Sequence, residues 1–376
     1  MKILYIGHYK ENTGWAQAAK DYILALDSIG VDIVCRNVTL TKDSNNIPQR
    51  ILELEKKNAS ECDICIQHVL PHHLVKTDLF KKNIAYFVYE SPKFNHLNWF
   101  IQLQQMDEIW VPNQDLKKIL IRDNIGVPVK LVPHCFDIEK YTKKYPEINI
   151  PDLNNKYKFY YIGDLNERKN LRSVIRCFHS EFDKSENVAL VIKARKFGLS
   201  PDQLKQTLNQ IIGEEKTKLR LYKDQSEYLK DFIVTEDLND EQVNSLHQYC
   251  DCFVCPSHGE AWSIPSFDAM AFGNTPICTN WGGPKEFIDG SQMKTGVCVD
   301  AVASVCQCPD AAFPDIFTGK EYWFTPCEMQ IREAMRTYYQ SSNKIASKQA
   351  GLKQAKKFSY ENIGNIMKEI LSESNV

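Results

Sequence analysis

Residues 252–279 read CFVCPSHGEAWSIPSFDAMAFGNTPICT, and this stretch decides the fold. Apolar runs at 252–256 and 275–279 predict two strands, and the small and apolar residues at 265–272 predict a helix between them. Pro265 suits the first turn of that helix, where a backbone N–H has no helical partner to lose. A strand, a helix and a strand in this order are typical of a parallel sheet covered by helices.

The same alternation extends along most of the chain, in two series separated by the polar stretch KKYPEINIPDLNNK at residues 143–156. The first series predicts strands at 2–7, 31–38, 62–69, 83–89, 108–112 and 129–133, and helices at 15–28 and 113–123. The second predicts strands at 157–163, 188–194, 218–222, 232–235, 252–256, 275–279 and 295–299, and helices at 170–182, 239–249, 265–272, 327–340, 344–357 and 360–373. Residues 300–325 interrupt the alternation, and we expect an inserted loop there.

Two such series predict an α/β protein with two Rossmann-like, doubly wound domains that face a central cleft. We expect the first domain to span residues 1–145 and the second to span residues 146–355. Ligands of open α/β sheets bind beyond the carboxyl ends of the strands. The loops that follow predicted strands are therefore the places to look for functional side chains.

The composition limits the class of protein. The chain has 376 residues, of which 43% are hydrophobic and 25% are charged, and its formal net charge is −2 at pH 7. This balance argues against a polyanion as a whole-surface partner. The 13 cysteines, many of them within apolar runs, favour reduced thiols over a disulfide framework. There is no signal-peptide pattern and no apolar window of about 18 residues, so we expect a cytoplasmic protein without a strong membrane signal.

Two loops could hold a phosphate group. Gly14 comes directly before a predicted helix, whose N-terminus offers free N–H groups to a ligand. In YYIGDLNERKN, at residues 160–170, a strand is expected to end at Gly163, and Arg168 and Lys169 lead into the next helix. Two cations beside a helix N-terminus, at the carboxyl end of a strand, suit a diphosphate.

Two carboxylates, Glu260 and Asp268, lie eight positions apart on either side of a strand-to-helix turn. Glu260 is expected in the loop that follows a strand. Asp268 is rotated about 100° on the helix from Phe267, which belongs to the predicted buried face, so it need not point into the core. Both acids can therefore project into one cleft. A glycosidase, which uses two carboxyl groups across one bond, is a competing explanation.

Taken together, these residues resemble the nucleotide-sugar glycosyltransferases of GT-B fold, specifically the large retaining group called family 4. The most specific part is the acid–seven-residues–acid motif from Glu260 to Asp268, with AMAFGNTP and Gly282-Gly283 beyond it. DEIWVPNQDLKKIL and VPHCFD are similar to the family's segments before the interdomain linker, and GDLNERKN is similar to its phosphate-binding loop. FSYENIGNIMKEIL is similar to the closing helix, which implies that residues 356–376 cross back to the first domain.

The resemblance implies the transfer of a hexose from a nucleotide-diphosphate sugar, UDP-glucose or similar, to an acceptor hydroxyl with retention of configuration. It implies that Glu260 faces the donor sugar, that Lys169 and Arg168 neutralise the diphosphate, and that Asp268 holds the ribose. The further donor-binding residues that it implies are Gly14, Trp15, Gly163, His258, Gly259, Ala261, Trp262, Ser263 and Ile264. Neither a metal ion nor another cofactor is implied, because cations and helix termini take that role.

The chain departs from the family at two positions, since the second acid is Asp268 rather than Glu and Asp164 stands where an arginine is common. The acceptor side is expected in the first domain, where His8, His68 and Glu90 follow or end predicted strands. A glycan, a lipid-linked sugar, a protein or a modified nucleic acid are all compatible acceptors. A nucleotide-sugar epimerase on the same scaffold, or an inactive protein that binds a sugar nucleotide or a glycan, remain alternatives.

Overall fold

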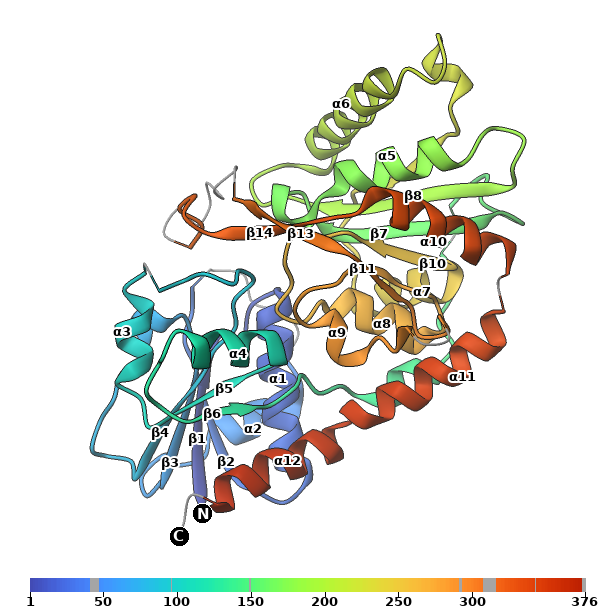
Figure 1. The fold of residues 1–376 in the computed structure, drawn as a ribbon. Helices are drawn as coiled ribbons and strands as arrows, with labels where there is room; N and C mark the ends of the chain where they lie inside the picture. Colours follow the sequence, from blue (N-terminus) through green and yellow to red (C-terminus); the bar gives the residue numbers. More distant parts are fainter. Residues whose placement is uncertain are drawn as a thin grey trace. The chain divides into compact units, whose positions relative to one another are not determined.

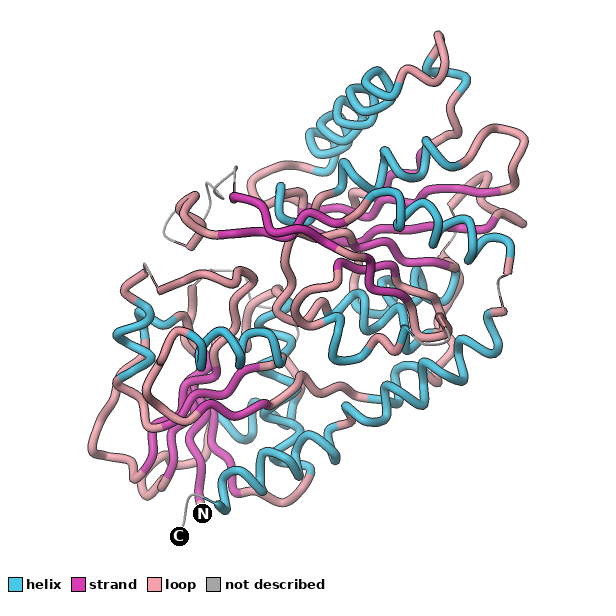
Figure 2. The backbone as a smooth tube through the Cα atoms, viewed as in Figure 1, coloured by secondary structure: helices cyan, strands magenta, loops and turns pink. Residues whose placement is uncertain are grey.

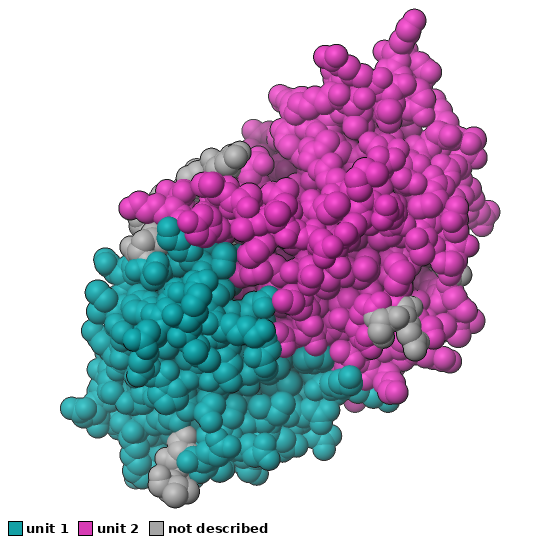
Figure 3. Space-filling model, viewed as in Figure 1, with its two compact units in different colours: residues 1–138, 356–376 teal, residues 139–355 magenta. Residues whose placement is uncertain are grey.

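The computed structural model describes residues 1–40, 47–95, 97–148, 150–290, 293–306, 316–341 and 343–373. The chain forms two compact units, which Figure 3 shows in different colours. Unit 1 consists of residues 1–138 and 356–376, and unit 2 consists of residues 139–355. In each unit the strands run side by side, with helices against the sheet (Figures 1 and 2).

Unit 1 is built on a six-stranded parallel sheet. Its order is β2 (Asp32–Asn37), β1 (Lys2–Gly7), β3 (Ile64–His68), β4 (Lys82–Tyr86), β5 (Glu108–Val111) and β6 (Val129–Leu131). Its helices are α1 (Gly14–Ser28), α2 (Gln49–Glu55), α3 (Trp99–Gln104), α4 (Gln114–Arg122) and α12 (Tyr360–Glu373).

The last helix, α12, packs on α1, although more than 300 residues separate them in the sequence (Figure 1). The hydroxyl of Tyr360 donates to Oδ1 of Asp21 over 2.5 Å. A Cβ atom on Gly364 would lie 2.8 Å from the carbonyl oxygen of Ala25, so the two helices approach closely at a position where only glycine fits without adjustment. The C-terminal helix is therefore part of the core packing of unit 1.

Unit 2 also holds a six-stranded parallel sheet. Its order is β12 (Val297–Val299), β11 (Ile277–Thr279), β10 (Cys252–Cys255), β7 (Tyr157–Asp164), β8 (Val188–Arg195) and β9 (Asp231–Val234). Its helices are α5 (Leu171–Glu181), α6 (Pro201–Leu219), α7 (Asp240–Tyr249), α8 (Ile264–Phe272), α9 (Pro284–Phe287), α10 (Glu328–Gln340) and α11 (Lys344–Ala355).

Both faces of the sheet in unit 2 are buried, which explains why its strands read as continuous apolar runs. Phe159 and Leu190 belong to the core on one face, whereas their chain neighbours Tyr160 and Val191 belong to the core on the other. The alternation of side chains along each strand thus supplies both cores.

The strand order places a topological switch point in each unit. In unit 2, β7 lies between β10 and β8, so the connections that leave β7 and β10 run to opposite sides of the sheet. In unit 1, β1 lies in the same way between β2 and β3. Such switch points open a crevice at the carboxyl ends of the strands, where ligands of α/β proteins bind.

Most predicted strands and helices are present within a few residues of their expected bounds, but two predictions are wrong. Residues 218–222, predicted as a strand, are the end of α6 and the turn that follows it. The apolar residues of α6 are sparse, and its start at Ser200 was the stronger signal. The Ser200 hydroxyl accepts from the backbone of Gln203, whose side chain bonds back to Ser200, and Pro201 opens the helix.

The second correction concerns residues 300–325, predicted as an inserted loop. They contain an antiparallel hairpin of β13 (Ala301–Val305) and β14 (Tyr322–Pro326), which Figure 1 shows beside the main sheet of unit 2. Residues 307–315 of the predicted loop lie outside the described residues. The hairpin escaped prediction because its two short strands are separated by a long connection rather than by a tight turn.

Candidate active site

The loops that follow β7 and β10 meet at the switch point of unit 2. Beyond β7, the side chain of Asn166 accepts from the backbone N–H of Lys169 and closes a single 3₁₀ turn over Glu167–Lys169. Asn170 then takes a left-handed conformation, with φ 53°, and its side-chain amide donates to the carbonyl of Pro256 over 2.9 Å. These contacts fix the β7 loop against the β10 loop.

The joined loops bring a lysine and a buried glutamate into contact. Nζ of Lys169 lies 2.7 Å from Oε1 of Glu260, and the hydroxyl of Ser257 donates to the same oxygen over 2.5 Å. Nη1 of Arg168 lies 3.5 Å from that oxygen. The structure thus brings together the three residues predicted as catalytic.

Glu260 is held as a carboxylate. Burial alone would raise the pKa of its carboxyl group, but the charges of Lys169 and Arg168 and the hydrogen bonds from Lys169 and Ser257 outweigh burial and lower that pKa. With two cations and one anion, the cluster carries one net positive charge. It is therefore suited to an anionic group of a ligand.

Arg168 also supports the backbone of the β10 loop. Its Nη1 donates to the carbonyl of Gly259 over 2.6 Å, and its own carbonyl accepts from the backbone N–H of His258 over 2.7 Å. His258 and Gly259, predicted to bind the donor, are therefore fixed by the residue predicted to bind the diphosphate.

Two glycines after β11 let the chain approach this loop closely. A Cβ atom on Gly282 would lie 2.1 Å from the carbonyl oxygen of Glu260, and one on Gly283 would lie 2.1 Å from Cα of Trp262. The backbone N–H of Gly283 donates to the carbonyl of Glu260 over 3.0 Å. The glycine pair therefore forms a backbone support under residues 260–262.

The start of α8 is unusual. The helix begins at Ile264, one residue before its predicted start, and Ser263 has φ 72°, a left-handed conformation that glycine takes more readily. Its side chain makes no capping hydrogen bond to the helix and instead pairs with the hydroxyl of Ser266 at 2.7 Å. The turn leaves Ala261 and Ile264 partly exposed, whereas Trp262 is buried.

Asp268 belongs to a different set of contacts. Its Oδ1 accepts from the hydroxyl of Tyr141 over 2.6 Å and lies 2.9 Å from Nζ of Lys140. These partners come from the segment Ile138–Tyr141, which the sequence did not single out. The two acids of the motif thus have separate partners.

Gly163 lies near the end of β7, one residue earlier than the strand's last residue, Asp164. The side chain of Asp164 accepts from Nε of Arg195 over 2.6 Å, at the carboxyl end of the neighbouring strand β8. The acid that stands in place of the family's arginine is therefore neutralised by a cation from β8.

In unit 1, three predicted residues gather at the switch point between β1 and β3. His8 directly follows β1, His68 ends β3, and the ring centroid of Trp15 lies 5.7 Å from that of His8 and 5.5 Å from that of His68. Nδ1 of His8 bonds the carbonyl of Val38 at 2.6 Å, so Nε2 is the ring's acceptor. Trp15, predicted on the donor side, thus lies with the acceptor-side histidines of unit 1.

The other two predicted residues of unit 1 are Gly14 and Glu90. Gly14 is exposed as the first residue of α1, whose N-cap is Thr13. Glu90 is partly buried in the segment that follows β4.

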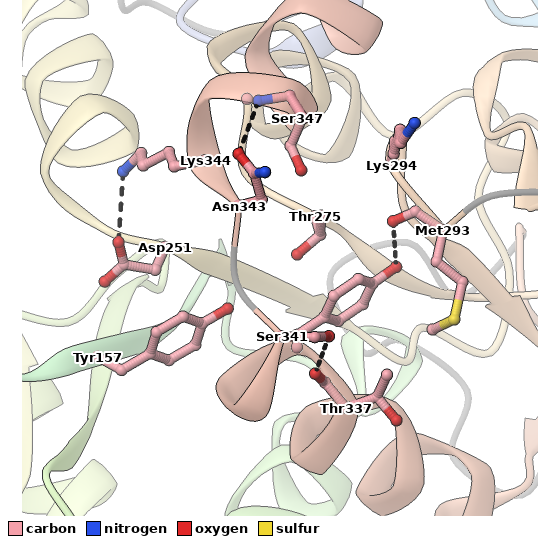
Figure 4. A pocket seen from close by; sticks show the side chains of 13 residues that line it. Tyr157, Asp251, Thr275, Met293, Lys294, Thr337, Ser341, Asn343, Lys344 and Ser347 are labelled. Carbon is pink, nitrogen blue, oxygen red and sulfur yellow. Dashed lines mark hydrogen bonds and ion pairs between the residues drawn. The ribbon is translucent and has the colours of Figure 1, made fainter.

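A cavity of about 450 Å³ lies in unit 2, at strand starts rather than at strand ends (Figure 4). Its lining includes Tyr157, the first residue of β7, and Asp251 and Thr275, which precede β10 and β11. Lys344, which also lines the cavity, already has partners within the protein: its Nζ donates to the carbonyl of Cys250 over 2.5 Å and lies 3.4 Å from Oδ1 of Asp251. This cavity does not include the cluster around Glu260.

Among the residues that the structure describes, no three His, Cys, Asp or Glu side chains are grouped so that they could hold a metal ion. Within the same ranges, no helix is long and apolar enough to cross a membrane.

Comparison with protein families identifies part of unit 2. Residues 146–305 match the family model for glycosyl transferases group 1. The matched region includes β7 to β12, the Lys169–Glu260 pair and Asp268. The predicted resemblance to group 1 glycosyltransferases is therefore confirmed over this region. Comparison with curated protein sequences returned no match.

Solved structures of similar fold cover nearly the whole chain. Anabaena Alr3699/HepE in complex with UDP-glucose has 13% identity and a TM-score of 0.65, with 99% of this chain and 100% of that chain covered. Sucrose-phosphate synthase from Thermosynechococcus elongatus has 11% identity and a TM-score of 0.65, with 99% of each chain covered. An E. coli structure titled "Trehalose-6-phosphate" and bound with UDP-2-fluoro glucose has 10% identity and a TM-score of 0.65, covering 98% of this chain and 99% of that chain.

At these identities the likeness concerns the fold alone. Together with the two six-stranded parallel sheets, it confirms the predicted fold class of two Rossmann-like domains. That the two domains face a common cleft stays a prediction.

Sequence reasoning missed several supporting residues of the candidate site. Ser257 was not singled out as a candidate, although its hydroxyl donates to Oε1 of Glu260. Trp323 was not singled out, and its ring stacks on His258 with centroids 5.3 Å apart. Ser257 could have been found from its position at a strand end, whereas nothing in the sequence placed Trp323 beside the β10 loop.

Proposed function

We propose that this chain is a retaining glycosyltransferase that moves a hexose from a UDP-sugar, UDP-glucose or similar, to an acceptor hydroxyl. The observation that carries the proposal is the meeting of Lys169, Arg168 and Glu260 at the switch point of the region that matches the group 1 glycosyltransferase model. Structures of the same fold that hold UDP-glucose and UDP-2-fluoro glucose support UDP as the nucleotide.

The cluster suits the chemistry of a leaving diphosphate. Negative charge builds on the diphosphate as its bond to the sugar breaks, and preorganised cations at that place lower the barrier. A lysine ammonium group has three N–H donors, and the contact with Glu260 uses one of those of Lys169. The others remain for phosphate oxygens, so the donor can bind without separating the pair.

In the proposed reaction, the acceptor oxygen forms a bond to the anomeric carbon on the face from which the diphosphate leaves. The bond between that carbon and the phosphate oxygen breaks, and its electron pair stays with the departing UDP. The acceptor proton passes to a phosphate oxygen of the same leaving group. The protein's part is to hold the reacting groups in place and to stabilise the developing charge.

Glu260 has two roles in this proposal. It orients Lys169 through Oε1 and faces the donor sugar as a carboxylate, because its lowered pKa keeps it ionised at neutral pH. Asp268 is assigned to the ribose hydroxyls, together with its neighbours Tyr141 and Lys140. The backbone and side chains of Gly163 and residues 258–264 complete the donor site.

The acceptor is assigned to unit 1. Burial lowers the pKa of His8, so its ring is neutral at pH 7 and Nε2 can accept a hydrogen bond from a hydroxyl group. His68 and Glu90 belong to the same assignment, and Gly14 and Trp15 are assigned to the donor. The proposed reaction needs neither a metal ion nor another cofactor. We place the enzyme in the cytoplasm.

A ligand panel tests the proposal. Thermal unfolding of the full chain is measured with UDP, GDP, ADP and their common sugars, in the wild type, in Asp268→Ala and in the control Asp152→Ala, whose ion pair with Lys230 is exposed. We expect UDP and a UDP-sugar to raise the unfolding temperature of the wild type and the control, but not of Asp268→Ala. No stabilisation by any nucleotide would refute the proposal.

The products decide the remaining points. With an acceptor in hand, the anomeric configuration of the product is read by NMR, and an inverted anomer would refute retention. Turnover should persist in excess EDTA. Conversion of the UDP-sugar into another UDP-sugar without an acceptor would instead establish the epimerase alternative.

A further inference from the structure

The β13–β14 hairpin packs directly on the candidate donor loop of unit 2. The ring of Trp323 in β14 lies parallel to the imidazole of His258, with centroids 5.3 Å apart and an interplanar angle of 4°. Phe317 contacts Trp323 edge-on at 5.9 Å, and Trp281, which precedes the glycine pair, stacks on Phe324 at 5.1 Å. Aromatic side chains of the hairpin therefore pack against His258 of the β10 loop and against Trp281.

Two hydrogen bonds also join His258 to Phe324 of the hairpin. The backbone N–H of Phe324 donates to the carbonyl of His258 over 2.9 Å, and Nδ1 of His258 lies 3.1 Å from the carbonyl oxygen of Phe324. A carbonyl oxygen can only accept, so Nδ1 must carry the proton. The stacked ring sets the plane of the imidazole, and this hydrogen bond sets its tautomer.

The arrangement leaves Nε2 as an acceptor. Burial lowers the pKa of His258, with Glu167, Arg168 and Arg176 as the charged groups that act on it, so the ring is neutral at pH 7. His258 is only partly buried, unlike its neighbours Ser257 and Gly259. A neutral acceptor on a partly exposed ring suits a ligand hydroxyl group rather than a phosphate oxygen, which cannot donate at neutral pH.

His258 is also tied to the predicted diphosphate site. Its backbone N–H donates to the carbonyl of Arg168 over 2.7 Å, and Glu260 follows two residues later in the same loop. A hydroxyl group that reaches Nε2 therefore belongs to one of the two sugars bonded to the diphosphate, the ribose or the hexose. Because the proposed function assigns the ribose to Asp268, the hexose is the sugar left for His258.

We propose that Trp323 and Phe324 of the hairpin position His258 so that its Nε2 accepts a hydrogen bond from a hydroxyl group of the donor sugar. The inference rests on the proposed function, because it assumes that a sugar nucleotide occupies this site. In this arrangement Trp323 is a positioning residue and His258 touches the substrate. The hairpin thus acts on the sugar half of the donor and not on the nucleotide half.

The test compares the affinities for UDP and for UDP-glucose, measured by calorimetry on the full chain. The variants are His258→Ala, His258→Gln, Trp323→Leu and Trp323→Phe, with Thr325→Ala on the same strand as the control, since the Thr325 hydroxyl pairs with Ser304. Loss of one neutral hydrogen bond predicts about a five- to tenfold weaker affinity for UDP-glucose in His258→Ala and Trp323→Leu. Affinity for UDP should stay within about twofold.

The conservative variants separate positioning from general support. Trp323→Phe keeps a ring to stack, and His258→Gln keeps an acceptor near the position of Nε2, so both should recover most of the affinity for UDP-glucose. Equal loss of affinity for UDP and UDP-glucose would overturn the inference, because the hairpin would then support the whole loop. Unchanged affinities would overturn it as well. If the wild type binds neither ligand, the proposed function itself fails, a result that the wild-type measurement alone shows.

Discussion

Replacing Lys169 with methionine tests the electrostatic account of the candidate site. The substitution keeps the length of the side chain and removes its charge. It leaves Glu260, which is 7% exposed, without the ammonium group 2.7 Å from its Oε1. Breaking a buried ion pair by removing one partner costs about 3–5 kcal/mol, because the other charge remains buried. Arg168 at 3.5 Å and the Ser257 hydroxyl remain, so we expect the low end, about 3 kcal/mol.

Urea unfolding at pH 7.5 measures this cost for Lys169→Met, Glu260→Gln and the double variant. In the double variant no charge is left unpaired by the change, so it should be more stable than Lys169→Met alone. Lys230→Met is the matched control, because Lys230 pairs with Asp152 and both side chains are about two-thirds exposed. That pair should contribute less than about 1 kcal/mol.

The dependence on pH gives an independent check. The pKa of Glu260 is lowered in the folded state, so its stabilising contribution is complete above the ordinary carboxyl pKa and is lost as the pH falls through the folded value. The difference in stability between the wild type and Lys169→Met should therefore be largest above the ordinary carboxyl pKa of 4.5 and should shrink as the pH falls below that value. If Lys169→Met costs no more than Lys230→Met, or if the double variant shows the sum of the single costs, the reasoning is refuted.

Two further predictions concern the support of the site and the core of unit 2. Gly283→Ala should lower the rate of glycosyl transfer by about 100-fold, because the new Cβ would lie 2.1 Å from Cα of Trp262 and displace the loop. Gly290→Ala is the control, because a Cβ atom at Gly290 would have no atom within 4 Å. Equal activity of the two variants would contradict the expectation. His247 is buried against Tyr160, and burial lowers the pKa of its imidazole from 6.5 to about 4. Because the unfolded chain then binds a proton more readily than the folded protein, the free energy of unfolding should fall as the pH drops from about 6.5 to about 4. The loss should reach at most about 3 kcal/mol, and thermal unfolding should show a shallower pH dependence for His247→Asn than for the wild type.

The sequence predicted the fold class because the two sheets of parallel strands are buried on both faces. Strands such as YKFYYIG and CDCFVC then read as unbroken apolar runs between amphipathic helices, a pattern with few other interpretations. The prediction failed where this signal is absent. The strand expected at 218–222 was a short apolar fragment at the end of α6, and the true signal was the capping box at Ser200.

The sequence predicted those residues of the candidate site that come shortly after a strand in the chain. Lys169, Arg168 and Glu260 follow strands closely, and the rule that ligands bind at strand ends selected them. The rule could not show that β7 and β10 are neighbours, which depends on strand order and is what brings Lys169 to Glu260. It also could not find Tyr141 or Trp323, whose contacts with Asp268 and His258 join segments about 65 or more residues apart in the chain.

The contact between Lys169 and Glu260 affects how the diphosphate of the proposed donor would bind. If the carboxylate and the diphosphate competed for a single N–H group, binding would have to break a buried ion pair, and much of the binding energy would be lost in doing so. The three donors of an ammonium group remove that conflict, and the carboxylate instead fixes the direction in which the remaining donors point. Arg168 is fixed in a different way, by the carbonyl of Gly259. Both cations are therefore oriented before a ligand arrives, and so little reorganisation is left for the moment when charge develops on the leaving group.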